Sequence, residues 1–216
     1  MPPLRSTKAK KLLYFALFSG VSILNCIDKR LFLFFCLFYT IEIMDGKKHE
    51  KFTWENLGDI KEGRKELGEE MPVLVYRLMQ YTMLDVLSET VGLEEANEYF
   101  RRAGFLAGFE FAKNTLDLKA DFNAFMAELQ KTLRNLKIGI LRLEVFNSET
   151  GSIVLTVDQD LDCSGLPITH ENVCVYDEGF IAGILETYTG KKYDVREVDC
   201  WANGARTCRF RGKVIS

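Results

Sequence analysis

The spacing of hydrophobic residues along the chain changes from a helical period to a strand period about two thirds of the way along. From Gly68 onward, apolar residues recur every three or four positions, as on one face of an amphipathic helix. Val91-Gly92 interrupts this pattern. A second helix is predicted from about Leu93 to Leu116, and a third from about Asp121 to Leu136 with Asp121 as its N-cap.

Two glycines, Gly104 and Gly108, lie one turn apart inside the second predicted helix. Each costs about 1 kcal/mol relative to alanine in a helix interior. We therefore expect the backbone of another element to approach the helix closely at this stripe. Tight packing of two helices and a groove for a ligand both explain such an approach.

After residue 136 the hydrophobic period becomes two, which predicts strands at 138–146 and 153–157 joined by a turn. A fourth helix is predicted over 176–188. Strands at 192–201 and 207–214 follow, with Asn203-Gly204 as a hairpin signal. Helices followed by a β-β-α-β-β run indicate an α+β fold, with N-terminal helices packed on one face of an antiparallel sheet.

The chain is predicted to have three parts: an apolar segment at 1–43, a polar lead-in at 44–69 and a folded domain at 70–214. The apolar segment holds two runs separated by Asp28-Lys29-Arg30, and neither run reaches the roughly 18–20 residues that a spanning helix needs. Three interpretations stay open: a membrane anchor, a signal peptide, and an upstream segment absent from a mature protein that starts at Met44. We expect membrane association only if residues 1–43 are retained.

The net charge argues against a nucleic-acid partner. Residues 45–216 hold 22 Lys and Arg against 29 Asp and Glu, a net charge of −7. A protein that binds the phosphate backbone needs a basic face, so no nucleic-acid binding is expected.

Four of the six cysteines fall within 46 residues: Cys163, Cys174, Cys200 and Cys208. Cys174, Cys200 and Cys208 together with Glu197 are enough to close a tetrahedral zinc site. Cys200 lies opposite Cys208 only if the hairpin loop exceeds two residues, and Glu197 joins them only if its strand bulges or begins later. Spacing alone leaves a metal site, a disulfide and unlinked buried thiols open. Cys163, in a loop, is either a spare ligand or a free thiol.

The C-terminal motif resembles the 4-vinyl reductase domain family, which includes sensor domains of phenol-responsive activators. The resemblance covers about residues 70–214. It is carried by Cys174-Val-Tyr-Asp-Glu-Gly179, Glu197-x-x-Cys200 and Gly204-x-x-x-Cys208-x-Phe210. It implies zinc held by Cys174, Glu197, Cys200 and Cys208, an irregular strand at Glu197, and a homodimer of α+β domains.

The resemblance also implies that a small hydrophobic molecule binds between the helices and the sheet. The expected function is therefore a cytoplasmic sensor or carrier without catalysis. Candidate ligand contacts are five aromatic residues: Phe105, Phe109, Phe122, Phe125 and Tyr176. A phenol sensor is not expected, because the only histidines are His49 and His170 and Phe125 stands where a polar group would be needed.

Two alternatives to a binding module are a structural or tethering dimeric subunit and a tetrapyrrole enzyme of the vinyl reductase type. The enzyme is disfavoured because the chain shows no dinucleotide fingerprint: neither GxxxG pair follows a strand and a turn. A site closed by three Cys and one Glu also leaves no open position for catalysis.

Overall fold

The computed structural model describes residues 50–215. The predictions for residues 1–43, and for the start at Met44, lie outside the described residues. From Phe52 onward the chain forms one unit. Its elements are η1 (Trp54–Leu57), α3 (Ile60–Gly63), α4 (Val73–Val91), α5 (Leu93–Thr115), α6 (Phe122–Asn135), β1 (Ile140–Phe146), β2 (Ile153–Asp158), α7 (Val175–Thr189), β3 (Tyr193–Asp199) and β4 (Cys208–Val214).

The helix boundaries follow local signals in the sequence. Gly92 has a φ of 89° and separates α4 from α5, a conformation that glycine adopts without steric cost. Asp121 caps α6, because its side chain accepts hydrogen bonds from the backbone N–H groups of Asn123 and Ala124. The predicted ends of α5, α6 and α7 are confirmed to within one or two residues, whereas α4 begins directly after Pro72 rather than near Gly68.

The four strands form one antiparallel sheet in the order β1-β2-β4-β3. Alternate residues of β2, from Ile153 to Val157, face the core. The opposite face of the sheet is polar, and Arg209 there pairs with Glu144 and Asp199. Because one face is buried and the other is charged, the sheet can be covered by helices on one side only.

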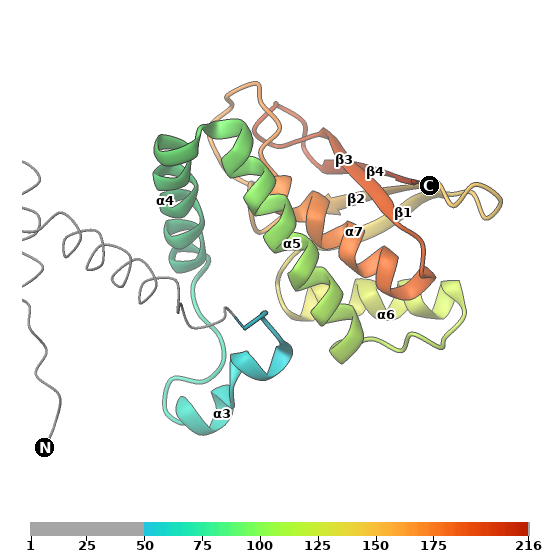
Figure 1. Ribbon diagram of the computed structural model, residues 1–216, viewed down its shortest axis with the longest axis horizontal. Coiled ribbons are helices and arrows are strands. Elements are labelled where there is room, and N and C mark those ends of the chain that lie inside the picture. The colour runs from blue at the N-terminus through green and yellow to red at the C-terminus, as the bar shows by residue number, and fades with distance from the viewer. Residues whose placement is uncertain (1–49, 216) are drawn as a thin grey trace, which may run out of the picture. The chain divides into compact units, whose positions relative to one another are not determined.

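The helices form successive layers on the apolar face of the sheet (Figure 1). Helix α7 packs against β3 and α6 against β1; α5 packs on α7, and α4 packs on α5. The predicted α+β class, with helices on one face of an antiparallel sheet, is confirmed.

The crossing of α5 and α7 is made by four glycines that face each other in pairs. A Cβ added at Gly104 or Gly108 would meet the backbone of Tyr176 or Phe180, and one added at Gly179 or Gly183 would meet the backbone of α5 in return, all well inside 3.0 Å. No side chain fits between the two helices here. The close approach predicted at Gly104 and Gly108 is confirmed, and it serves helix packing.

Helix α4 presents its apolar side to solvent. Leu74 is 68% exposed, Val86 60% and Leu78 57%. On the opposite side, Tyr76 and Gln80 hydrogen-bond to the loop after β2, and Leu84 and Leu87 are partly buried. Within residues 50–215, no helix combines the length and the hydropathy needed to cross a membrane.

Candidate metal centre and the adjoining cavity

Four cysteine sulfurs meet at one end of the sheet. Cys163 comes from the loop after β2, Cys174 directly precedes α7, Cys200 directly follows β3, and Cys208 begins β4. The four sulfur atoms lie within 4.8 Å of one another. All four residues are free thiols, and each is at most 1% exposed. The fold thus brings together residues that are 45 positions apart in the chain.

Two of the sulfur–sulfur distances match a tetrahedral metal site, and one is shorter. Zinc–sulfur bonds of about 2.3 Å place neighbouring sulfurs about 3.8 Å apart in a regular tetrahedron. Cys174 Sγ lies 3.8 Å from Cys200 Sγ and 3.9 Å from Cys208 Sγ. Cys163 Sγ lies 3.1 Å from Cys208 Sγ, closer than the tetrahedral spacing but far beyond a disulfide bond. The donor set therefore suits a thiophilic divalent ion.

The hairpin between β3 and β4 has the longer loop that the site requires. The strand ladder ends at the pair Asp199–Arg209, which leaves Cys200 and Cys208 facing each other at its mouth. A register shift between Glu197 and Asp199 marks a bulge in β3. The carbonyl of Cys200 accepts the N–H groups of Asn203 and Ala205 and so tightens the loop. Both predicted irregularities, a hairpin loop longer than two residues and a bulge at Glu197, are confirmed.

Cys163 is presented by a short loop that the polar side of α4 holds in place. Asp160 Oδ1 accepts the backbone N–H groups of Asp162 and Cys163 at 2.9 and 3.2 Å, which fixes the turn. Tyr76 Oη and Gln80 Nε2 donate to the two carboxylate oxygens of Asp162 at 2.8 and 2.7 Å. This contact joins the first long helix of the domain to the cysteine cluster.

Arg77 and Tyr81 extend this contact to the loop backbone. Arg77 donates to the carbonyls of Leu161 and Ser164 at 2.8 and 2.9 Å, and Tyr81 donates to the carbonyl of Asp162. These α4 residues were not predicted from the sequence. The only available signal was a polar stripe at positions i, i+1, i+4 and i+5, which is also typical of a solvent-exposed helix face.

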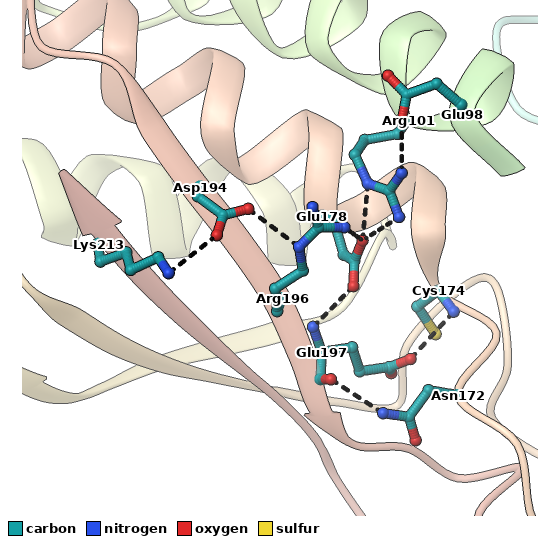
Figure 2. A network of polar contacts seen from close by, with 9 residues as sticks. All are labelled: Glu98, Arg101, Asn172, Cys174, Glu178, Asp194, Arg196, Glu197 and Lys213. Atoms are coloured by element: carbon teal, nitrogen blue, oxygen red, sulfur yellow. Dashed lines mark hydrogen bonds and ion pairs between the residues drawn. The ribbon is translucent and has the colours of Figure 1, made fainter. Parts of the chain in front are cut away.

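Glu197 lies beside the cluster, and its carboxylate belongs to a chain of polar contacts (Figure 2). Glu197 Oε2 accepts the backbone N–H of Cys174 at 3.1 Å, whereas Oε1 is buried and has no hydrogen-bond partner among the described residues. The backbone N–H of Glu197 donates to Glu178 Oε1 at 2.9 Å, and Arg101 Nη2 pairs with Glu178 Oε2 at 2.8 Å. Glu197 is not one of the four residues whose donor atoms all lie within 4.8 Å. Its assignment as a metal ligand stays a prediction.

The pKa shifts of the clustered cysteines run in opposite directions. Hydrogen bonds from the thiols of Cys163, Cys174 and Cys208 lower the pKa of Cys200, while thiol–thiol contacts and burial raise the pKa of Cys174 and of Cys208. Burial, with the charge of Cys200, raises the pKa of Glu197 to about 8. One thiolate is thus stabilised by its neighbours, but four buried thiolates need a divalent cation to balance them.

A small cavity lies between the sheet, α6 and α7. Its volume is about 30 Å³. Most of its wall is aliphatic, supplied by residues such as Leu133, Leu155 and Ile184, and the polar residues Asp160 and Asp177 also line it. As it stands, the cavity is much smaller than the engineered cavity of about 150 Å³ that holds a benzene ring.

None of the five predicted ligand contacts is among the residues that line this cavity. Phe125 is fully buried and stacks on Tyr188 with ring centroids 3.9 Å apart; Phe122 stacks on Phe146 at the same distance. Tyr176 stacks on Phe180.

The other two predicted contacts, Phe105 and Phe109, lie on α5. Phe105 lines a surface groove together with Arg101 and Glu178, and Phe109 is 38% exposed. The assignment of all five residues to a ligand site stays a prediction.

Comparison with known proteins confirms the resemblance that the cysteine motif predicted. Residues 153–214 match the 4-vinyl reductase domain. An uncharacterised protein of Methanocaldococcus jannaschii is 27% identical over 151 residues, which cover 70% of this chain and 83% of that protein. A second uncharacterised protein of the same organism is 23% identical over 150 residues, covering 69% of this chain and 80% of that protein.

Three solved structures of proteins with different described roles have the same fold as this chain. The phenol-responsive sensory domain of the transcription activator PoxR, solved with phenol, gives a TM-score of 0.53 at 16% identity over 73% of this chain and 90% of that one. A vinyl-4-reductase family protein of M. jannaschii gives 0.53 at 16% identity over 78% and 100%. A trafficking protein particle complex subunit 3 of Naegleria fowleri, covalently bound to palmitic acid, gives 0.50 at 12% identity over 67% and 98%. At these identities the likeness is one of fold.

Proposed function

We propose that this chain is a zinc-stabilised binding domain for a small hydrophobic molecule, acting as a sensor or carrier without catalysis. The fold is shared with a phenol-responsive sensory domain and with a subunit covalently bound to palmitic acid. In this chain an apolar cavity lies in the layer between the helices and the sheet. The observation that carries the proposal is the buried cluster of four thiols beside this cavity. A metal ion bound by these thiols would fix the helices and the sheet relative to each other around the cavity.

Zinc would be held by Cys174, Cys200, Cys208 and Cys163, with Glu197 as the alternative to Cys163. Four thiolates complete a tetrahedral coordination sphere, so the ion would supply stability rather than an open position for substrate. It would join the hairpin, the start of α7 and the loop after β2, which are three separate segments of the chain. Zinc thiolates need reduced cysteines, which favours the cytoplasm as the compartment.

The exposed face of α4 favours a homodimer. Leu74, Leu78, Met79, Met83 and Val86 are each more than half exposed and recur at helical spacing. Contiguous apolar surface of this kind marks interaction sites. The opposite face of α4 is fixed to the cysteine loop, so the helix offers a rigid apolar stripe to a second copy.

A structural or tethering subunit is the second candidate function. The cavity of about 30 Å³ supports it, because a core that is nearly filled holds no ligand of the size of phenol without rearrangement. In that case the metal and the α4 face would serve assembly alone.

Native mass spectrometry of the protein purified without added ligand tests these proposals. A dimer with one zinc per chain and a small organic adduct is the expected result. Zinc and a dimer without an adduct would favour the structural subunit. A metal-free chain lighter by four hydrogens would show two disulfides and would overturn the zinc site together with the cytoplasmic assignment.

A further inference from the structure

Glu178 joins three elements of the domain beside the cysteine cluster (Figure 2). It lies in the first turn of α7, four residues after Cys174, and is 8% exposed. Its Oε1 accepts the backbone N–H of Glu197 in β3 at 2.9 Å. Its Oε2 accepts Arg101 Nε of α5 at 2.9 Å and Arg196 Nη1 of β3 at 3.4 Å. A single carboxylate thus links α5, α7 and β3.

The start of α7 and Glu197 are hydrogen-bonded to each other in both directions. Glu178 of the helix accepts the backbone N–H of Glu197, and the carboxylate of Glu197 accepts the backbone N–H of Cys174 at 3.1 Å. Asn172 Nδ2 adds a third bond, to the carbonyl of Glu197 at 2.9 Å. Strand β3 lies at the edge of the sheet, where it pairs with β4 alone. These bonds therefore take the place of a neighbouring strand on its free side.

This arrangement fixes the distance between two of the clustered cysteines. Cys174 directly precedes α7, and Cys200 follows Glu197 by three residues, just after the bulge in β3. Their Sγ atoms lie 3.8 Å apart, the spacing of neighbouring sulfurs around a tetrahedral zinc ion. A helix and an edge strand that were free to slide past each other would not keep this spacing. Ion pairs from α5 and β3 in turn hold Glu178 in place, since a buried carboxylate needs partners.

We propose that Glu178 is a positioning residue for the metal centre, acting through Glu197 on Cys174 and Cys200. This inference rests on the proposed zinc site. It holds for either fourth ligand, Cys163 or Glu197, because Cys174 and Cys200 belong to both ligand sets. Groups that orient metal ligands from outside the coordination sphere typically lower the metal affinity about 10- to 100-fold when they are removed. We expect a loss of that order when the Glu178 carboxylate is removed.

Glu178→Ala tests the assignment against two controls. Glu98→Ala removes the other carboxylate that pairs with Arg101. Gly183→Ala places a Cβ against the backbone of α5 farther along α7, so it controls for a general loss of stability in the contact of the two helices. The zinc affinity of each protein is measured in competition with a chromophoric chelator. Cobalt is then bound in place of zinc, because its visible absorption spectrum reports the geometry of its ligands.

Glu178→Ala is expected to lower the zinc affinity at least tenfold and to shift the cobalt spectrum. The two controls should change the zinc affinity less than threefold and leave the spectrum unchanged. A Glu178→Ala protein that binds zinc within threefold of the wild type would overturn the inference and leave the zinc site standing. So would a Gly183→Ala protein that loses as much zinc affinity, since the effect would then be one of stability.

A second variant covers the case in which Glu178→Ala does not fold. Arg101→Met removes the ion pair between α5 and Glu178 Oε2 but keeps the carboxylate. It should weaken zinc binding at least threefold, and an unchanged zinc affinity would overturn the inference. A wild-type chain that binds no zinc would overturn both the inference and the proposed metal site.

Discussion

Replacing Gly104 by alanine is expected to destabilise the domain, although alanine is the better helix former. The added Cβ would meet the carbonyl oxygen of Tyr176, which is part of the backbone of α7. Gly179 and Gly183 impose the same constraint from the opposite side, so the two helices cannot rotate to escape it. The methyl group is accommodated only if α5 and α7 move apart.

The size of the effect follows from two opposing terms. Overpacking costs about 1–3 kcal/mol, and the upper end applies here because the obstacle is backbone. Alanine returns about 1 kcal/mol of helix propensity. The net loss in the free energy of unfolding is therefore about 2 kcal/mol, which corresponds to a Tm lower by about 4–8 °C in a chain of this length.

Urea denaturation of the zinc-loaded protein, followed by circular dichroism, measures this difference. Gly63→Ala is the control, because a Cβ added there meets no atom within 4 Å. It should change the free energy of unfolding by less than about 0.5 kcal/mol. A Gly104→Ala protein as stable as the wild type would refute the close backbone contact of α5 and α7.

Three further predictions concern the metal, the α4 anchor and the dimer. Cys163→Ser should lower the zinc affinity at least tenfold, measured in competition with a chromophoric chelator. Glu197→Gln keeps an oxygen that accepts the N–H of Cys174, so it should change the zinc affinity less than threefold. The reverse order of the two effects would make Glu197 the ligand. Gln80→Leu should destabilise the domain by about 1–3 kcal/mol in urea, because Asp162 Oδ2 loses its donor; an unchanged midpoint would show that α4 is not anchored there. Leu78→Glu should give a monomer in sedimentation velocity, since it places a charge on the apolar stripe, and a persistent dimer would place the interface elsewhere.

The order of the elements and most of their ends could be predicted from the sequence because local signals fix them. Gly92 ends a helix, Asp121 begins one, and the change of hydrophobic period after residue 136 marks the start of the sheet. Gly104 and Gly108 also predicted a close contact, because two helix-interior glycines need a tertiary reason. The partner element could not be named, since the facing glycines lie about 75 residues further on.

The cysteine site could be predicted only in part, for physical reasons that concern Cys163. The hairpin pair and Cys174 have a recognisable spacing, and the bulge at Glu197 was a condition that the site itself imposed. Cys163 lies in a loop whose position depends on contacts with α4, more than 80 residues away in the chain. No local pattern encodes such a contact, and the polar side of α4 looks like a solvent-exposed face until its partner is known.

The measurement that tests the zinc site most directly is X-ray absorption at the zinc edge, made on protein that carries one zinc per chain. We predict that the ion is surrounded by four sulfur atoms at about 2.3 Å. Three sulfur atoms and one oxygen at about 2.0–2.2 Å would contradict this prediction and would put Glu197 in the place of Cys163.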